Sequence, residues 1–262
     1  MMQRDTNDQA DAGLTSRSVI GTRIDATSYQ DAITRIVAWA AASESRYVCF
    51  ANVHVVMQAH DDSSFRSVVA DADLVTPDGI PIVWALRLLR VPQATQCCGP
   101  ELMPMLFSAA ASRGINIGFY GGSDETLDRL LTKVRIQWPR ANIAYAFSPP
   151  FRTLTDQEDE IEIKRITDSG VRILFVGLGC PKQERWAAAH KGRLPVVMLG
   201  VGAAFDFLAG TKPVAPALMR RVGLEWIFRF VTEPKRLWRR YLYHNPRFLV
   251  RLAFQVLQQR VL

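Results

Sequence analysis

Short apolar runs alternate with helical patterns along most of the chain. The runs that predict buried strands are Val19–Ile24, Tyr47–Ala51, Ala72–Thr76, Asn116–Tyr120, Ile143–Ala146, Val171–Val176 and Val196–Leu199. The segments between them repeat apolar residues every three to four positions, which indicates amphipathic helices. Strands separated by helices of this length form mainly parallel sheets. The pattern therefore predicts an α/β fold with helices on both faces of a mainly parallel sheet.

Several of the helices have start signals in the sequence. Two capping-box patterns, each with an acid three residues after a hydroxyl, begin at Ser28 and Thr155. Further helices are predicted over Ile80–Leu89, Pro100–Arg113, Ser123–Gln137 and Gln183–His190. The residues expected to face inward in the second of these helices are Leu102, Met105, Leu106 and Ala109, and in the last Trp186 and Ala189 are expected to share one face.

Composition divides the chain into three parts. Residues 1–18 are polar and lack the apolar stretch of a signal peptide, so we expect a disordered leader. Residues 19–218 form the predicted α/β domain, in two Rossmann-like halves of about 19–113 and 114–218, and residues 219–262 form a basic, amphipathic helical tail. No apolar run reaches the roughly 18 residues that a helix needs to span a bilayer.

The net charge of +7 is concentrated in the tail. Residues 219–262 contain ten Arg or Lys and two acids, a charge of +8, so the rest of the chain has a charge of −1. Aromatic residues such as Trp238 and Phe254 are interleaved with these cations. This composition is typical of an interfacial helix on anionic lipid. No RNP, KH or zinc-finger pattern supports nucleic acid as the partner, and a solvated basic face is the remaining alternative.

Cysteine and acid spacing predict no metal site. The four cysteines are Cys49, Cys97, Cys98 and Cys180. Adjacent cysteines such as Cys97 and Cys98 suit neither a zinc knuckle nor a disulfide framework, so a reduced, cytosolic setting fits. Asp71 and Asp73 resemble an Asp-x-Asp metal motif, but we expect the first to end a helix and the second to begin a strand. We therefore expect neither a metal nor another cofactor.

Turn-forming loops follow four of the predicted strands. They are Pro77-Asp78-Gly79, Gly121-Gly122, Gly177–Glu184 and Gly200–Asp206. In parallel sheets, ligands bind at the carboxyl ends of strands where the strand order reverses, so these loops are expected to share a site. The third loop opens a helix with Lys182, Gln183 and Glu184, and backbone N–H groups there suit a diphosphate. An ordinary strand–helix turn is the alternative for the glycines alone.

Asp78 lies between Pro77 and Gly79 at a predicted strand end. A sharp turn would present its carboxylate to the crevice, where it could act as a general base. The alternative, which spacing alone favours, is that Asp78 caps the following helix. Asn52, at the end of an earlier strand, could orient a sugar or an acceptor through its amide, whereas His54 is expected to pack rather than to act as a base.

Seven runs occur along the chain in a specific order. They are Asn52–His54, Ala72–Gly79, Gly99–Met103, Gly177–Glu184, Gly200–Asp206, Gly223–Arg229 and Glu233–Tyr241. Together they resemble the WecG/TagA/CpsF glycosyltransferase family over about residues 19 to 250. The resemblance implies an inverting, metal-independent transfer of a sugar from a UDP-sugar to an undecaprenyl-diphosphate-linked (polyprenyl) saccharide at the cytoplasmic face of the inner membrane. Such enzymes build exopolysaccharide or other cell-surface polysaccharide, and UDP-glucose, UDP-N-acetylmannosamine and its uronic acid are the donor options.

The resemblance also implies roles for single residues. Asp78 would be the general base, Gln183 would contact the active site, and arginines of the tail would close over the diphosphate. The residues expected to contact substrate are Asn52, Gly79, Gly121, Gly122, Gly177, Gly179, Lys182, Gln183, Glu184, Gly202, Asp206, Arg229, Arg236 and Arg239.

The chain departs from the family pattern at four positions. They are Phe50, Gln96, Glu101 and Val214, where the family commonly has Thr, Arg, Asp and Arg. These differences bear on substrate choice and activity, so a catalytically inactive homologue on the membrane is an alternative. A nucleotide-binding oxidoreductase is another, but residues 24–50 lack the Gly-x-Gly-x-x-Gly turn that it needs. A tail that covers its own site could instead serve a neighbour in a homo-oligomer.

Overall fold

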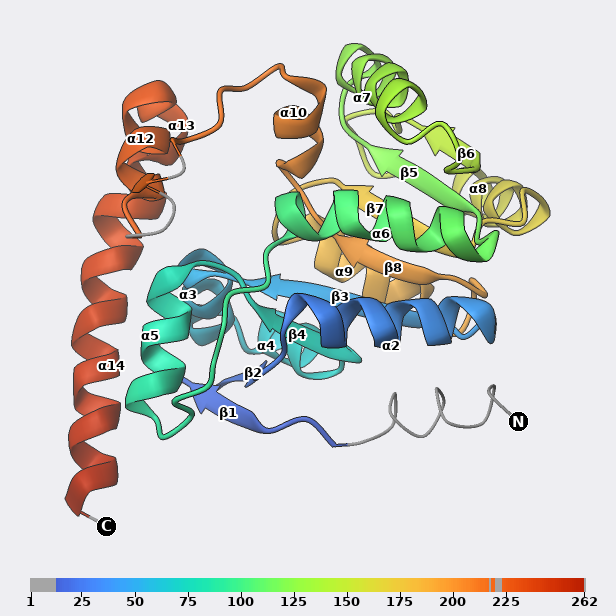
Figure 1. Ribbon diagram of the computed structural model, residues 1–262. Helices are drawn as coiled ribbons and strands as arrows, with labels where there is room; N and C mark the ends of the chain where they lie inside the picture. The colour runs from blue at the N-terminus through green and yellow to red at the C-terminus, as the bar shows by residue number, and fades with distance from the viewer. Residues whose placement is uncertain (1–12, 217, 220–222, 262) are drawn as a thin grey trace.

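A six-stranded parallel sheet forms the centre of the computed structural model, which describes residues 13–216, 218–219 and 223–261 (Figure 1). Its strands are β3 (Arg46–Ala51), β4 (Leu74–Pro77), β5 (Ile117–Gly121), β6 (Ile143–Phe147), β7 (Ile173–Gly177) and β8 (Val197–Gly200). They lie in the order β4-β3-β8-β7-β5-β6, and every neighbouring pair is parallel. The predicted Rossmann-like α/β fold is confirmed.

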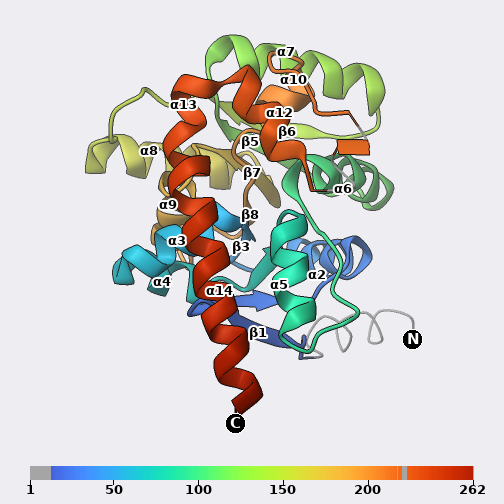
Figure 2. The ribbon, with the colours of Figure 1, turned by 90° about the vertical axis from the view of Figure 1, so that its left-hand side faces the viewer.

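Helices cover both faces of this sheet (Figures 1 and 2). One face is covered by α2 (Tyr29–Ala41), α6 (Gly99–Arg113), α7 (Asp124–Gln137) and α10 (Ala204–Ala209). The other is covered by α3 (Val53–Asp61), α4 (Ser63–Ala70), α8 (Asp156–Asp168) and α9 (Lys182–His190), with α5 (Ile80–Leu88) at its edge. A hydrophobic core lies on each face of the sheet. Successive residues of a strand point to opposite faces, so Cys49 belongs to one core and Phe50 to the other.

The strand order reverses between β3 and β8, in the middle of the sheet. From β3 the chain passes to α3 on one face, whereas from β8 it passes to α10 on the opposite face. Because the two connections diverge, a crevice forms between the carboxyl ends of these strands. The fold thus fixes the place of a ligand site before any side chain is considered.

The N-terminal strand prediction is wrong in detail. The expected strand Val19–Ile24 is an antiparallel hairpin, β1 (Ser16–Val19) and β2 (Thr22–Asp25), outside the main sheet. Ile20 and Gly21 between them have φ of 52° and 81°, the left-handed conformation of a tight two-residue hairpin turn. Residues 16–18 of the predicted leader are therefore paired, whereas its residues 1–12 lie outside the described part of the chain.

Leu102 and Leu106 of α6 are buried as the helical period predicts, but single residues differ. Met105 is 44% exposed, and Met103 and Phe107 are buried instead. On α9 the buried positions include Ala187, whereas Ala189 is exposed. The buried stripe of α6 is Leu102, Met103, Leu106, Phe107 and Ala110, which has helical spacing and leaves Met105 on the outer side.

The described part of the tail forms α12 (Glu225–Thr232), α13 (Pro234–Trp238), the π-helical turn η1 (Arg239–Tyr243) and α14 (His244–Val261). Helix α14 packs along α3, where Phe248 and Leu252 are buried (Figure 2). Arg247 donates two hydrogen bonds of 2.7 and 2.6 Å to the Asp61 carboxylate, and Gln255 bonds the hairpin at both Ile20 and Ser18. The tail therefore docks on its own chain.

None of the described helices combines the length and the apolar character needed to cross a membrane. The tail instead keeps several apolar side chains in solvent. They are Trp238, Leu242, Tyr243, Leu249, Val250, Phe254 and Leu257, each about half or more exposed.

Candidate active site

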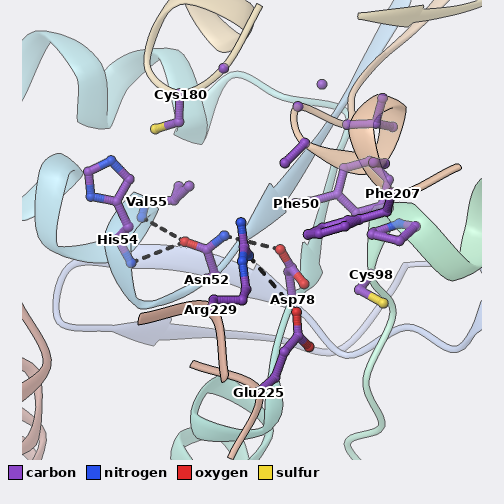
Figure 3. Close-up of a pocket in the computed structure, with 18 of the residues that line it drawn as sticks. Phe50, Asn52, His54, Val55, Asp78, Cys98, Cys180, Phe207, Glu225 and Arg229 are labelled. Carbon is purple, nitrogen blue, oxygen red and sulfur yellow. Dashed lines mark hydrogen bonds and ion pairs between the residues drawn. The ribbon is translucent and has the colours of Figure 1, made fainter. Parts of the chain in front are cut away.

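A cavity of about 830 Å³ opens at the carboxyl ends of β3, β4, β7 and β8. Strand-end loops form its floor, the amino end of α6 forms one wall, and α10 with the tail closes it from outside. Figure 3 shows the side chains that point into it. The cavity lies at the reversal of strand order, so three of the four loops singled out in the sequence reach it.

Asn52 and Asp78 form the polar centre of the cavity. Asn52 is the N-cap of α3: its Oδ1 accepts hydrogen bonds from the backbone N–H groups of His54 and Val55, at 3.1 and 3.3 Å. Its Nδ2 then donates to Asp78 Oδ2 at 3.1 Å (Figure 3). A helix cap thereby fixes the rotamer of Asn52, and through it the direction of the Asp78 carboxylate.

Asp78 is not a helix cap, so the alternative that spacing favoured is wrong. Gly79 takes the N-cap position of α5 with φ of 100°, a conformation that glycine adopts readily, and no side chain caps this helix. The Asp78 backbone N–H instead donates to Ala51 O at 3.0 Å, extending the β3–β4 ladder by one residue. The carboxylate is left facing the cavity rather than the helix end.

Arg229 lines the same cavity from α12, with 16% of its side chain exposed. Its guanidinium lies 5.2 Å from the centre of the Phe207 ring and 3.9 Å from the Glu225 carboxylate. In Figure 3 it converges with Asn52 and Asp78. The tail thus brings one positive charge to the carboxyl ends of the strands, across a long separation in sequence.

Gln183 is buried and fastens two strand-end loops to each other. Its amide oxygen, Oε1, accepts from the Gly179 N–H at 3.1 Å, and its Nε2 donates to the Gly200 carbonyl and, at 2.9 Å, to Glu184 Oε1. Both amide hydrogens are used by the two bonds from Nε2. Gln183 lines the cavity, but its contacts make it a residue that positions the loops after β7 and β8.

The glycines of the four loops separate into two groups. Gly179 and Gly202 line the cavity. Gly121, Gly122 and Gly177 are not among its described lining residues. Packing requires glycine at positions 121 and 177, whereas a Cβ on Gly122 would meet its nearest neighbour at an ordinary 3.4 Å. A Cβ on Gly177 would lie 2.6 Å from the Phe205 ring, and one on Gly121 would lie 2.7 Å from the Gly177 backbone.

Four other expected contacts do not reach the cavity or are not described. Lys182 is exposed in the first turn of α9. Asp206 pairs with Lys212 at 2.8 Å and accepts from Thr211, so it closes the turn after α10. The side chains of Arg236 and Arg239 lie outside the described part of the structure, which gives only their backbone in α13 and η1.

The amino end of α6 forms a wall of the cavity that was not among the expected substrate contacts, although Glu101 was noted as a departure from the family pattern. Cys98 and Glu101 line the cavity there, and Tyr29 of α2 donates a 2.6 Å hydrogen bond to Glu101 Oε2. The Cys98 N–H in turn donates to the Tyr29 hydroxyl at 3.3 Å. Burial raises the pKa of the Cys98 thiol, and the charges of Asp78 and Glu101 raise it further. The sequence feature that could have revealed this wall is a Gly-Pro pair at the start of a helix that follows a long loop.

Other missed lining residues come from distant parts of the chain. They include His54, Cys180, Phe207, Glu225, Leu237 and His244, and Phe50, one of the four departures from the family pattern, lines the cavity as well. His54 and His244 face each other with ring centres 5.3 Å apart, which joins the start of α3 to the start of α14. No sequence pattern pairs two histidines 190 positions apart, because only the docking of the tail brings them together.

Within the described residues, no cluster of three or more His, Cys, Asp or Glu side chains could hold a metal ion. Asp73 lies at the amino end of β4, at the opposite edge of the sheet from the cavity, and binds Arg46 and Lys191. Asp73 therefore has a structural role in two ion pairs.

The arrangement combines an oriented carboxylate with a guanidinium in one partly enclosed cavity. A carboxylate can remove a proton from a hydroxyl, and a guanidinium can offset negative charge on phosphate oxygens. These two abilities are the ones that a transfer from a phosphorylated donor to a hydroxyl acceptor requires.

Comparison with known proteins identifies the family. A model of the Glycosyl transferase WecG/TagA/CpsF family matches residues 17–261. Two proteins of Staphylococcus aureus, from strains COL and MRSA252 and both named N-acetylglucosaminyldiphosphoundecaprenol N-acetyl-beta-D-mannosaminyltransferase, are each 28% identical to this chain over 238 residues, covering 90% of it and 91% of the relative. Because the family model spans nearly the whole chain, this protein is a glycosyltransferase and belongs to the WecG/TagA/CpsF family.

Proposed function

We propose that this glycosyltransferase moves a sugar from a UDP-sugar to an undecaprenyl-diphosphate-linked saccharide, with inversion at the anomeric carbon, in exopolysaccharide or cell-surface polysaccharide synthesis. The names of the staphylococcal relatives support a lipid-linked acceptor of this kind. The observation on which the proposal rests is the Asp78 carboxylate, held by Asn52 in a cavity that also contains Arg229.

The reaction assigns one role to each of these groups. Asp78 removes the proton from the acceptor hydroxyl while its oxygen attacks the anomeric carbon. The bond between that carbon and the diphosphate oxygen breaks, and UDP leaves with the electron pair. Arg229 offsets the charge that develops on the diphosphate. Attack and departure on opposite faces of the sugar in a single step give inversion.

The Gly179 and Gly202 loops are the proposed contacts for the donor's diphosphate. Both glycines line the cavity and have positive φ, and nothing lies within 4 Å of a Cβ built on Gly179. The open space above the Gly179 backbone allows a diphosphate to approach the main chain closely. In this proposal Gln183 holds the two loops at a fixed separation rather than binding the donor itself.

UDP release is the direct test of the proposal. The wild-type protein is given UDP-glucose, UDP-N-acetylmannosamine and their uronic acids, with lipid-linked acceptor extracted from membranes. We expect UDP release from at least one donor, dependent on acceptor, and a product whose anomeric configuration by NMR is opposite to that of the donor. Retention of configuration would refute inversion, and no release from any donor would favour a catalytically inactive homologue.

Replacing Asn52 with Asp tests the Asn52–Asp78 hydrogen bond. Asp caps helices as well as Asn, so we expect the free energy of unfolding to change by less than about 1 kcal/mol. The Nδ2 donor is replaced by an acceptor, however, and two carboxylates would repel each other across the present 3.1 Å contact. We expect kcat to fall about 10- to 100-fold, since a small displacement of a reacting group has effects of that order. Unchanged kcat would show that Asn52 does not position Asp78.

We further propose that the tail holds the protein on the cytoplasmic face of the inner membrane as a peripheral protein. The exposed apolar residues of η1 and α14 occur in the segment where the positive charge is concentrated. We expect cosedimentation with vesicles that contain anionic lipid and about tenfold weaker binding to neutral vesicles, because each cation near an anionic surface contributes about 1 kcal/mol. Equal binding to both vesicles, or none to either, would contradict this.

A further inference from the structure

Helix α5 carries apolar side chains on its outer side as well as on its inner side. The apolar residues buried on the inner side are Ile82, Val83, Ala85 and Leu86. Ile80, Trp84 and Leu88 recur every fourth residue and form a second row, the outer row of α5, in which Trp84 is 50% and Leu88 54% exposed. A helix that borders water normally carries polar residues on this side. The outer row therefore indicates that α5 borders something apolar.

The outer row of α5 adjoins the tail. A Cβ built on Gly223, just before α12, would lie 3.2 Å from Ile80 and 3.5 Å from the Trp84 ring. Figures 1 and 2 both show α14 beside α5. Arg87 and Arg90 are exposed at the carboxyl end of α5 and add positive charge there. Apolar and cationic side chains together are typical of an element on anionic lipid, and α5 shares this combination with the tail.

A narrow side pocket of about 110 Å³ connects the outer row to the main cavity. The residues that line both are Asn52, His54, Asp78, Gln96, Glu225 and Arg229. Beyond them the side pocket runs between the amino end of α5, at Ile80 and Pro81, and the tail, at Trp226 and Tyr241. The Trp226 and Tyr241 rings lie 5.8 Å apart and form its tail side. The side pocket thus leads from Asp78 to Ile80, the first residue of the outer row.

An acceptor of the proposed kind has two ends with opposite requirements. Its saccharide must bring a hydroxyl to Asp78, whereas its polyprenyl chain is stable only in an apolar surrounding. The side pocket suits such a molecule, because one end of it is polar at Asn52 and Asp78 and the other is apolar at Ile80. With the outer row on lipid, the saccharide could reach Asp78 while the chain stays in the bilayer.

We propose that α5 is a second membrane-contacting element beside the tail, with Ile80, Trp84 and Leu88 in lipid, and that the lipid-linked acceptor enters through the side pocket. The acceptor route rests on the proposed function, whereas the lipid contact of α5 does not. The contact also fixes the orientation of the protein, because two elements on one surface leave it less freedom to rotate than the tail alone.

The first experiment compares two acceptors that share saccharide and diphosphate, with the full-length protein and the donor that it uses. One acceptor has its natural chain and is held in vesicles that contain anionic phospholipid; the other has a short chain and is soluble in water. In the double variant Trp84→Gln/Leu88→Gln, kcat/KM for the vesicle-held acceptor relative to the short-chain acceptor should fall about tenfold, through a higher KM, because apolar contact with lipid is lost.

The matched control is Ile136→Gln/Ile161→Gln, which removes two exposed apolar side chains from α7 and α8. These side chains are 73% and 52% exposed, and we expect the ratio between the two acceptors to equal that of the wild type. An unchanged ratio in the α5 variant, or an equal fall in the control, would overturn the inference while donor turnover leaves the proposed function standing.

A fluorescent label tests the lipid contact without turnover. Leu88→Cys, labelled with nitrobenzoxadiazole, should emit at shorter wavelength when vesicles with anionic phospholipid are added, and Ile136→Cys with the same label should not. The wild type taken through the same labelling corrects for reaction at Cys180, which is partly exposed. No shift at position 88 would overturn the inference. A shift that appears without vesicles as protein concentration rises would assign the outer row to a second copy of the chain and overturn it too.

The label also keeps the two proposals distinguishable. If no donor yields UDP, the proposed function fails and the acceptor route fails with it, and the emission of labelled Leu88→Cys alone decides whether α5 contacts lipid. The label decides in the same way if Trp84→Gln/Leu88→Gln does not fold.

Discussion

Replacing Asp78 with Asn is expected to lower kcat by about 10²- to 10⁴-fold, the range that a general base contributes. Asparagine keeps the size of the side chain and an oxygen that can accept from Asn52 Nδ2, as Asp78 Oδ2 does at 3.1 Å. The variant should therefore retain the architecture of the cavity and lose only the group that takes the acceptor's proton. KM for the donor should change little, because the proposed donor contacts lie on other loops.

The control for this prediction is Asp128→Asn, which makes the same chemical change at an exposed position of α7. We expect its kcat to equal that of the wild type. Denaturant midpoints of all three proteins establish that they are folded to the same extent. If Asp78→Asn turned over donor at a rate within a few-fold of the wild type, the enzyme would need another base and Asp78 would have to be removed from the mechanism.

Replacing Gly121 with Ala is expected to destabilise the fold by about 3 kcal/mol or more. Gly121 is paired with Gly177 across β5 and β7 and has φ of 114°, which L-residues rarely adopt. A Cβ there would lie 2.7 and 2.8 Å from the carbonyl carbon and oxygen of Gly177. Because these are backbone atoms in the middle of the sheet, neither strand can move without disturbing its other neighbour.

Gly192→Ala separates the strain of a positive φ from the clash of an added Cβ. Gly192 also has a positive φ, of 84°, but nothing lies within 4 Å of its built Cβ. Its alanine variant therefore reports the backbone strain alone, about 1 kcal/mol. Urea unfolding measures the loss of stability in both variants, provided that the m-value is unchanged. Equal losses of stability would mean that the sheet relaxes around the added methyl group in Gly121→Ala and that the close approach of β5 and β7 is not required.

The Gly121–Gly177 contact also bears on activity. The chain segment after Gly177 leads to Gly179 and Gln183, which line the cavity. Any displacement of the β7 end would be transmitted to these residues through the hydrogen bond from Gly179 N–H to Gln183. Stability and donor turnover should therefore fall together in Gly121→Ala, in contrast to Asp78→Asn, where only turnover falls.

Local patterns determined the elements of this protein. The capping boxes at Ser28 and Thr155 begin helices as predicted, because the bonds that define them join residues three apart. Six of the seven apolar runs became the strands of the sheet, with small shifts at their ends. The position of the ligand cavity also followed, since strand–helix alternation implies a parallel sheet with its loops at one edge.

Local patterns failed where two conformations satisfy the same sequence. Val19–Ile24 is apolar enough for one strand, but the turn at Ile20 and Gly21 divides it. The sequence around Asp78 also suits a helix cap. The hydrogen bond from Asn52 and the extension of the β3–β4 ladder turn its carboxylate toward the cavity instead. Gly121 and Gly122 were expected to contact substrate, whereas strand contact explains the first of them.

The sequence by itself determined the α/β alternation, the helix starts, the basic tail and, through the order of its motifs, the family resemblance. Tertiary structure alone decided which loop residues face the cavity, placed Tyr29 against Glu101, and brought Arg229 and His244 of the tail to the strand ends. The physical reason is range: caps, turns and periodicity act within about one turn of helix, whereas these contacts depend on how whole elements pack.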